Sequence, residues 1–214
     1  MTLPLTPDEL LTTTRTVRKR LDLTRSVPLD LVRECLEIAV QAPSGSNAQS
    51  WHWMVVTDAA QRAAVGQIYR QQVLRYAASP GYAGRLFADR PDRARVQQRV
   101  SASVLWLGDH MGHVPVLVIP CIRTGEPLRA GNQAGLWGSL LPAAWSYCLA
   151  ARARGLGTAW TSLHLSREAE VAQLLGIPRG VHQGALIPTA YYTGATFQPA
   201  PREPLDTVVH LNRW

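Results

Sequence analysis

Eighteen consecutive residues without a charged side chain, Ala134 to Ala151, restrict the fold of this chain more than any other feature of its sequence. The run is at the lower limit for a membrane-spanning helix, which needs about 20 predominantly apolar residues. Two glycines, two serines and Pro142 lower its hydropathy, and arginines flank it. Because the chain has only one such run, we favour a helix that is buried on all sides over a membrane span.

The composition is that of a globular chain, with 46% apolar and 17% charged residues among 214. We expect one α+β domain over residues 1–214, since no repeat or linker interrupts it. The net charge is +7, and nearly all of the positive charge is arginine, Lys19 being the sole lysine. The basic residues are dispersed and no nucleic-acid-binding module is recognisable, so we expect no nucleic-acid partner.

The cysteines indicate a reducing compartment, since there are three of them, far apart along the chain. The N-terminal segment has no basic stretch followed by an apolar run, so it does not read as a signal peptide. We therefore expect a cytoplasmic protein without a membrane anchor.

Local patterns predict the elements. Thr6 to Glu9 forms a capping box that opens a helix ending near Thr14. Helical periodicity and stop signals predict further helices over 25–42, 59–78 and 132–151, one over 166–176 with Ser166 as its N-cap, and an irregular and then helical segment over 81–100. Apolar, β-branched runs predict strands over 51–57, 114–122, 158–165 and 184–194, and a short apolar strand over 208–214.

A search for catalytic motifs gives no convincing nucleophile or metal site. The segment "GLGTAW" begins like a dinucleotide-binding turn, but Trp160 stands at the third glycine position and the segment opens a strand. His110 and His113 have no further ligand at suitable spacing, which favours a structural role. Ser44 lacks the Gly-x-Ser-x-Gly pattern of a nucleophile elbow.

An anion-binding set is the remaining candidate. In "RTVR", Arg15 and Arg18 bracket the hydroxyl of Thr16, which suits one phosphate group. Arg202 lies between two prolines that stiffen the chain around it. On spacing alone, however, these residues read more simply as surface arginines in an arginine-rich protein.

Four segments in this order carry a family resemblance: "RTVRKRLD", "APSGSNAQSWHWMVV", "LAARARGLGTAWTSLHL" and "PREPLDTVVHLNRW". Together they resemble the flavin-dependent nitroreductase family. The resemblance covers nearly the whole chain except roughly 78–112, and we expect a variable lid over about 69–112. It implies a nitroreductase-like fold, with a central, mostly antiparallel mixed sheet flanked by helices. It also implies an intertwined homodimer with FMN in two interface sites.

The resemblance also implies roles for individual residues. The uncharged segment, 132–151, corresponds to the long interface helix of the family. Trp145 and Ser146 stand where many members carry Gln-Asn. The implied FMN contacts are Arg15, Thr16 and Arg18 at the phosphate and ribityl chain, Pro43, Ser44 and Asn47 beside the ring, Thr161 and Ser162 near N5 and O4, and Arg202 at the phosphate.

The implied function is an FMN-dependent oxidoreductase that passes hydride from NAD(P)H to a nitroaromatic, quinone or similar small acceptor in a ping-pong cycle. The flavin carries that chemistry, so no catalytic side chain is expected. Alternatives on the same fold are a reductive dehalogenase, a flavin-fragmenting enzyme and a non-catalytic FMN storage protein. The acceptor and the choice between NADH and NADPH stay open.

Overall fold

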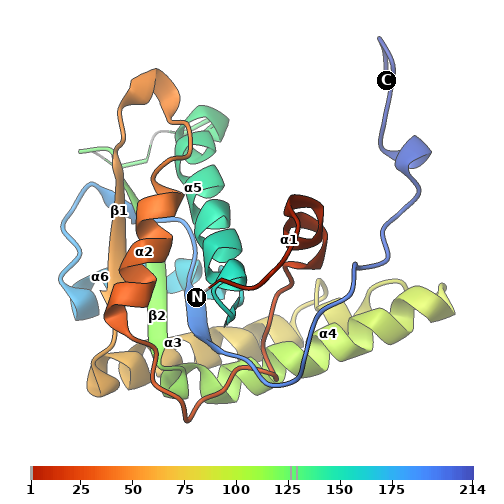
Figure 1. Ribbon diagram of the computed structural model, residues 1–214, viewed down its shortest axis with the longest axis horizontal. Helices are drawn as coiled ribbons and strands as arrows, with labels where there is room; N and C mark the ends of the chain where they lie inside the picture. The colour runs from red at the N-terminus through yellow and green to blue at the C-terminus, as the bar shows by residue number, and fades with distance from the viewer. Residues whose placement is uncertain (1, 126, 129) are drawn as a thin grey trace.

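A central antiparallel sheet organises the molecule (Figure 1). The computed structural model describes residues 2–125, 127–128 and 130–214. The strand order is β1-β2-β5-β3, and β4 pairs with β2. The strands are β1 (Trp51–Val56), β2 (Val116–Arg123), β3 (Leu156–Thr158), β4 (Val181–Gln183) and β5 (Ile187–Tyr191). All of their ladders are antiparallel. In the described part of the chain, parallel pairing is confined to an isolated bridge between Thr16 and Thr158.

Helices cover both faces of this sheet, so the predicted α+β class is confirmed. The α-helices of the described residues are α1 (Pro7–Thr13), α2 (Leu29–Ala39), α3 (Ala59–Ala78), α4 (Pro91–His110), α5 (Ala134–Ala153) and α6 (Glu168–Leu175). Short 3-10 turns are η1 (Gly45–Asn47), η2 (Ala83–Arg85), η3 (Met111–His113), η4 (Leu163–Arg167) and η5 (Leu205–Thr207). The predicted capping box opens α1, where Thr6 Oγ1 accepts from the Glu9 N–H at 3.2 Å.

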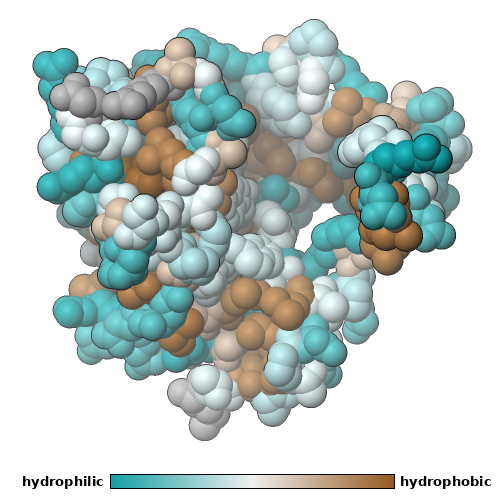
Figure 2. All heavy atoms as spheres, turned by 90° about the horizontal axis from the view of Figure 1, so that it is seen from above, coloured by the Kyte–Doolittle hydropathy of each residue, from teal (hydrophilic) through white to brown (hydrophobic). Residues whose placement is uncertain are grey.

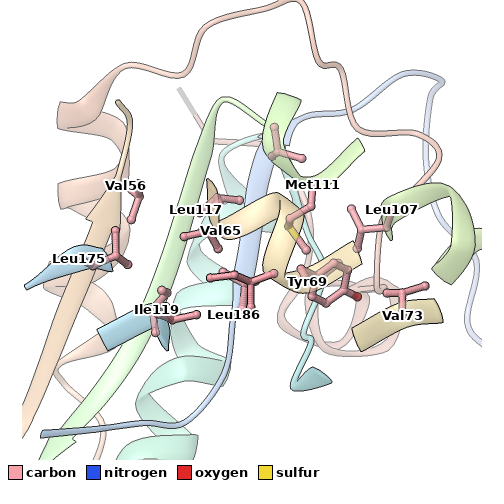
Figure 3. Packing of buried hydrophobic residues seen from close by; sticks show 14 of the residues in the cluster. Val56, Val65, Tyr69, Val73, Leu107, Met111, Leu117, Ile119, Leu175 and Leu186 are labelled. Atoms are coloured by element: carbon pink, nitrogen blue, oxygen red, sulfur yellow. The ribbon is translucent and has the colours of Figure 1, made fainter. Parts of the chain in front are cut away.

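Strand β2 is apolar almost throughout because both of its faces are buried. Val116 and Val118 pack in one cluster with residues of α2 and α5. The alternate residues Leu117 and Ile119 pack in a second cluster with residues of α3, α4 and α6, part of which Figure 3 shows. The sheet is therefore the middle layer, with α2 and α5 on one face and α3, α4 and α6 on the other.

Helix α5 differs from the expected helix buried on all sides. No helix in the described part of the chain has both the length and the apolarity to cross a bilayer. One face of α5 packs against α2 and the sheet. Its other face leaves Leu141 and Leu149 half-buried, and the side chain of Trp145 is 42% exposed. An uncharged helical stripe is thus only partly covered within one chain.

Three local predictions are wrong. The strand expected over 158–165 is β3 at Leu156–Thr158 followed by η4, because Ser162 leaves the extended conformation. Ser166 does not cap α6; it lies inside η4, where its hydroxyl donates to Gln72 Oε1 at 2.9 Å. The strand expected over 208–214 is absent. Those residues lie exposed beyond η5, with no neighbouring strand among the described residues to pair with.

Gly66 of α3 provides a test of this packing. A Cβ atom at position 66 would lie 2.6 Å from the backbone N of Gly112 in η3, so Gly66→Ala must force the helix and the turn apart. We expect a decrease of about 1–3 kcal/mol in the free energy of unfolding, measured with urea. Gly81→Ala is the control, since a Cβ there meets nothing within 4 Å. Equal stability of the two variants would contradict the close approach.

Candidate functional site

A cavity of about 530 Å³ lies at the edge of the sheet beside β3. Its walls come from the segment after α1, one face of α4, the middle of α5, the end of β3 and the C-terminal tail. The volume is within the range of about 300–1,000 Å³ that is usual for small-molecule sites. The cavity brings together parts of the chain that are nearly 190 residues apart, since Thr14 and Arg202 both line it.

The Arg15–Arg18 segment is fixed against the edge strand. The Val17 N–H donates to the Thr158 carbonyl at 2.8 Å, and the side chain of Val17 is 3% exposed. Gly157 permits this approach, because a Cβ there would lie 3.1 Å from the Val17 side chain. Side chains alternate along an extended segment, so burying Val17 turns its neighbours Thr16 and Arg18 toward the cavity.

Arg18 carries a donor without a partner. Its Nη1 donates to Ser103 Oγ on α4 at 3.2 Å. Its Nε is buried and has no hydrogen-bond partner among the described residues. Burial lowers the pKa of Arg18, an effect that Tyr69 and Tyr76 partly offset, although an arginine still remains charged. A buried, charged donor in a cavity wall fits an anionic ligand.

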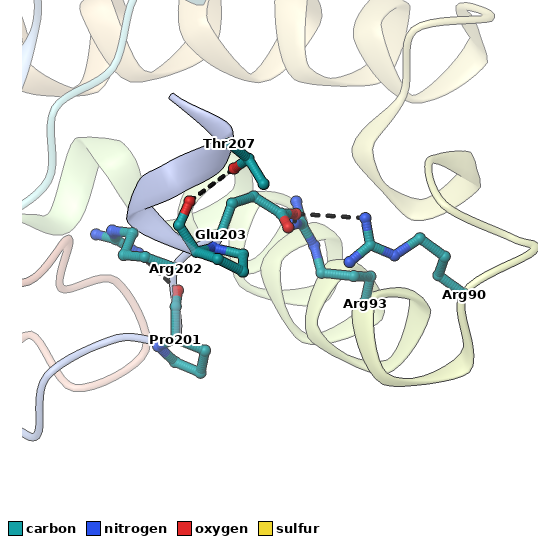
Figure 4. A network of polar contacts seen from close by, with 7 residues as sticks. Arg90, Arg93, Pro201, Arg202, Glu203 and Thr207 are labelled. Atoms are coloured by element: carbon teal, nitrogen blue, oxygen red, sulfur yellow. Dashed lines mark hydrogen bonds and ion pairs between the residues drawn. The ribbon is translucent and has the colours of Figure 1, made fainter. Parts of the chain in front are cut away.

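Arg202 approaches Arg15 from the tail. Burial and then the nearby charge of Arg202 lower the pKa of Arg15, so the two guanidinium groups share one region. The adjacent carboxylate, Glu203, does not line this cavity and instead pairs with Arg93 and Arg90, the latter at 3.4 Å (Figure 4). The tail is thereby tied to the start of α4, with Arg202 left at the cavity.

The remaining walls come from α4 and α5. Val96, Arg99, Val100 and Ser103 follow helical spacing on one face of α4, and Trp145 and Cys148 do so on α5. Burial raises the pKa of Cys148 to about 11, which keeps its thiol protonated and unreactive at neutral pH. Sequence reasoning missed the α4 residues, because no motif distinguishes Arg99 from the other dispersed arginines.

The Pro43–Asn47 loop lies away from this cavity. The Gly45 N–H donates at 3.0 Å to Ser139 Oγ, which lies on α5 nine residues before Cys148. At a rise of 1.5 Å per residue, that separation is roughly 13 Å along the helix. None of Pro43, Ser44 and Asn47 lines the arginine-rich cavity of its own chain.

The same loop holds an unusual conformation. Ser46, Asn47 and Gln49 adopt φ values of 53°, 50° and 49°, in the left-handed region that non-glycine residues seldom occupy. Ser44 Oγ accepts from the Gln49 N–H at 3.1 Å, and Asn47 Oδ1 accepts from Gln49 Nε2 at 3.0 Å. Backbone strain of this kind clusters at ligand-binding segments.

Thr161 and Ser162 follow directly after Trp160, which does line the cavity. The Thr161 N–H and hydroxyl both donate to the Leu186 carbonyl, at 3.0 and 2.7 Å, and Ser162 is exposed. The structure therefore brings Arg15, Thr16, Arg18 and Arg202 together. It leaves Pro43, Ser44, Asn47, Thr161 and Ser162 outside the cavity of the same chain.

Comparison with protein families matches residues 11–191 to the nitroreductase family. The chain belongs to this family. The match includes the Arg15–Arg18 segment, the Pro43–Asn47 loop and β3, and it stops before Arg202. None of the curated protein sequences matches the chain with significance.

Solved structures show the same fold at low sequence identity. An iodotyrosine deiodinase bound to FMN and 3-iodo-L-tyrosine is 20% identical, with a TM-score of 0.72, over 97% of this chain and 99% of that one. The FMN and NADPH-dependent nitroreductase NfnB from Sphigopyxis sp. strain HMH is 21% identical, with a TM-score of 0.67, over 98% and 100%. A BluB-like flavoprotein from Clostridium difficile 630 is 16% identical, with a TM-score of 0.67, over 98% and 100%.

The Glu203 contacts predict how the tail is held. Arg93→Gln should free the tail from α4 and speed tryptic cleavage after Arg202 about two- to fivefold, since a surface ion pair contributes up to about 1 kcal/mol. The variant leaves the sequence around the cleaved bond unchanged, and mass spectrometry would follow the cleavage. Arg95→Gln is the matched control on the same helix, and Arg95 has no ion pair with a described residue. Indistinguishable cleavage of both variants would show that the pair of Arg93 and Glu203 does not hold the tail.

Proposed function

We propose that this nitroreductase-family protein is an FMN-dependent oxidoreductase that passes hydride from NAD(P)H to a small acceptor such as a nitroaromatic or quinone. The observation that carries the proposal is the convergence of Arg15, Arg18 and Arg202 on one cavity, with no carboxylate among the described residues that line it. Their positive charges have no counter-ion there, and burial lowers the pKa of Arg15 and Arg18. Such a cluster fits a bound phosphate.

The donor set suits the FMN phosphate in particular. A phosphate monoester carries about −1.5 to −2 charges at neutral pH and accepts through three oxygens. Guanidinium groups bind such oxygens bidentately, and the Thr16 hydroxyl between Arg15 and Arg18 adds a neutral donor. The unpartnered Arg18 Nε would gain its acceptor from this group.

Bound FMN would supply the hydride transfer. The chain would bind the cofactor, orient it and exclude water. Trp145 and Trp160 give the cavity flat apolar walls, and Cys148 stays a neutral thiol beside them. No protein acid or base is required of this site. Thr161 and Ser162, next to Trp160 in the chain, would lie nearest the ring.

We further propose that two copies of the chain complete each site as a homodimer. The exposed side of α5 and the tail supply apolar surface for the partner: Leu205, Val208, Leu211 and Trp214 are 70%, 63%, 82% and 100% exposed. In Figure 2, apolar side chains gather on the lobe that stands off at the right, on the side where Figure 1 places the tail. A second copy would bring its own Pro43–Asn47 loop to the cavity.

The proposed location is the cytoplasm. Its support is that all three cysteines are buried, free thiols. No membrane or nucleic-acid partner forms part of the proposal, since the arginines are explained by a small phosphate ligand.

The test is a visible spectrum of the purified protein, followed by anaerobic addition of NADPH and, separately, NADH. The proposal predicts a yellow protein whose flavin absorbance is bleached by one or both. A colourless protein that FMN does not reconstitute would refute it. A yellow protein that neither nucleotide bleaches would instead favour a non-catalytic flavin protein or a relative with another reductant.

A reductive dehalogenase is the second candidate, because an iodotyrosine deiodinase shares the fold. In that reaction a carbon–halogen bond is replaced by a carbon–hydrogen bond and halide leaves; the reduced cofactor would supply two electrons, and one proton would be taken up. Iodide release from 3-iodo-L-tyrosine under anaerobic reducing conditions would distinguish it from reduction of nitroaromatics.

Arg202 gives a specific prediction. Arg202→Ala should weaken FMN binding by about 1.5–3 kcal/mol, the range for a hydrogen bond to a charged group, as measured by fluorescence titration of the apoprotein. Arg213→Ala is the matched control on the same tail, since Arg213 does not line the cavity. Unchanged FMN affinity of Arg202→Ala would remove Arg202 from the phosphate site.

The C-terminal tail gives a further testable prediction. Deleting residues 208–214 removes Val208, Leu211 and Trp214, which are exposed in the single chain. We expect the truncated protein to sediment more as a monomer and to lose FMN, because the proposed interface would lose apolar area. Analytical ultracentrifugation with detection of flavin absorbance measures both. A truncated protein that stays dimeric and yellow would contradict the proposed role of the tail.

A further inference from the structure

The cavity holds more positive charge than one flavin phosphate neutralises. Among the described residues, four arginines line it, Arg15, Arg18, Arg99 and Arg202, and no aspartate or glutamate does. A phosphate monoester carries about −1.5 to −2 charges. Beside it, a second cavity of about 400 Å³ shares Arg15, Thr16, Arg18 and Ser103 and adds Lys19 to the positive field.

Arg99 is a further cation of this cavity that lacks a counter-ion within the described part of the chain. It has no ion pair or hydrogen bond with any described residue, and it is exposed at the cavity wall. The tail carboxylate of Glu203 is already engaged by Arg93 and Arg90. Neutralisation of Arg99 must therefore come from a ligand or from solvent ions.

Arg99 comes from a different element than the Arg15–Arg18 segment. Arg18 reaches α4 through its hydrogen bond to Ser103. Arg99 lies one helical turn before Ser103, about 6 Å along α4 in the direction of the tail. Arg15, Thr16 and Arg18 belong to a single segment fixed to β3, whereas Arg99 reaches the cavity from α4.

We propose that this site takes a second ligand with an anionic group, a carboxylate or a phosphate, and that Arg99 binds that group. The inference rests on the proposed function, since it assigns the first phosphate to FMN. The anionic group belongs to one of the two reactants: a carboxylate of the acceptor or the 2′-phosphate of NADPH. Trp145 and Trp160 in the same cavity suit an aromatic acceptor that carries such a carboxylate.

Kinetics of Arg99→Gln test the inference. For an acidic acceptor, the ratio of kcat/KM for 4-nitrobenzoate to that for nitrobenzene should fall roughly tenfold or more relative to the unaltered protein. If Arg99 instead binds the 2′-phosphate of the hydride donor, the ratio of kcat/KM for NADPH to that for NADH should fall. Arg99→Lys should restore part of either ratio, because lysine keeps the positive charge but cannot make the bidentate hydrogen bonds of a guanidinium group.

Arg95→Gln is the matched control. Arg95 is an exposed arginine one turn earlier on α4 and does not line the cavity. Arg95→Gln should leave both the acceptor ratio and the NADPH to NADH ratio unchanged. If Arg99→Gln changes neither ratio, or weakens FMN binding tenfold in a fluorescence titration, then Arg99 binds no second anion and the inference is overturned.

A binding measurement separates this inference from the proposed function. Calorimetric titration with benzoate, with benzamide as the neutral isostere, needs no turnover and can be run on protein with or without flavin. Tighter binding of benzoate that Arg99→Gln abolishes supports an acidic acceptor. Equal binding of benzoate and benzamide, together with an unchanged NADPH to NADH ratio, overturns the inference. A protein that binds no FMN refutes the proposed function by a different readout.

Discussion

The pairing of the Arg15–Arg18 segment with the edge strand β3 is the constraint on which the cavity depends. It is a short contact, one backbone hydrogen bond to Thr158 and one buried valine packed on Gly157. Without it, the two arginines would belong to a mobile surface segment after α1. With it, their charges are fixed beside α4, α5 and the tail.

A fixed group of like charges is unfavourable without a ligand. Burial and then repulsion from Arg202 lower the pKa of Arg15, and burial lowers the pKa of Arg18. Glu203, the acidic residue next to Arg202 in the sequence, pairs with Arg93 instead. A bound anion would relieve this repulsion. The proposed cofactor would therefore stabilise the fold as well as carry the chemistry, by an amount that rises with its free concentration.

The sequence predicted most of the elements but only part of the site. The capping box, the doubly buried strand β2 and the uncharged helix α5 have patterns that local packing produces directly. Strand β4 is three residues long, too short for a period to be recognised, and η4 replaced part of a predicted strand. The sequence did not indicate Arg99, because the role proposed for it depends on its position in the folded chain. The Pro43–Asn47 loop was expected beside the same ligand as the arginines, but it lies away from the arginine-lined cavity of its own chain.

Each proposed site therefore needs two chains, with arginines from one copy and the Pro43–Asn47 loop from the other. Mixing two variants that each fail to bind FMN tests this most directly, one altered at Arg15 and Arg202 and one at Ser44 and Asn47. After subunit exchange, shared sites predict that mixed dimers regain FMN in one of their two sites, because one site then combines unaltered arginines with an unaltered loop. If the mixed dimers stay free of flavin while unaltered dimers treated alike bind it, each site is built from a single chain and the account is wrong.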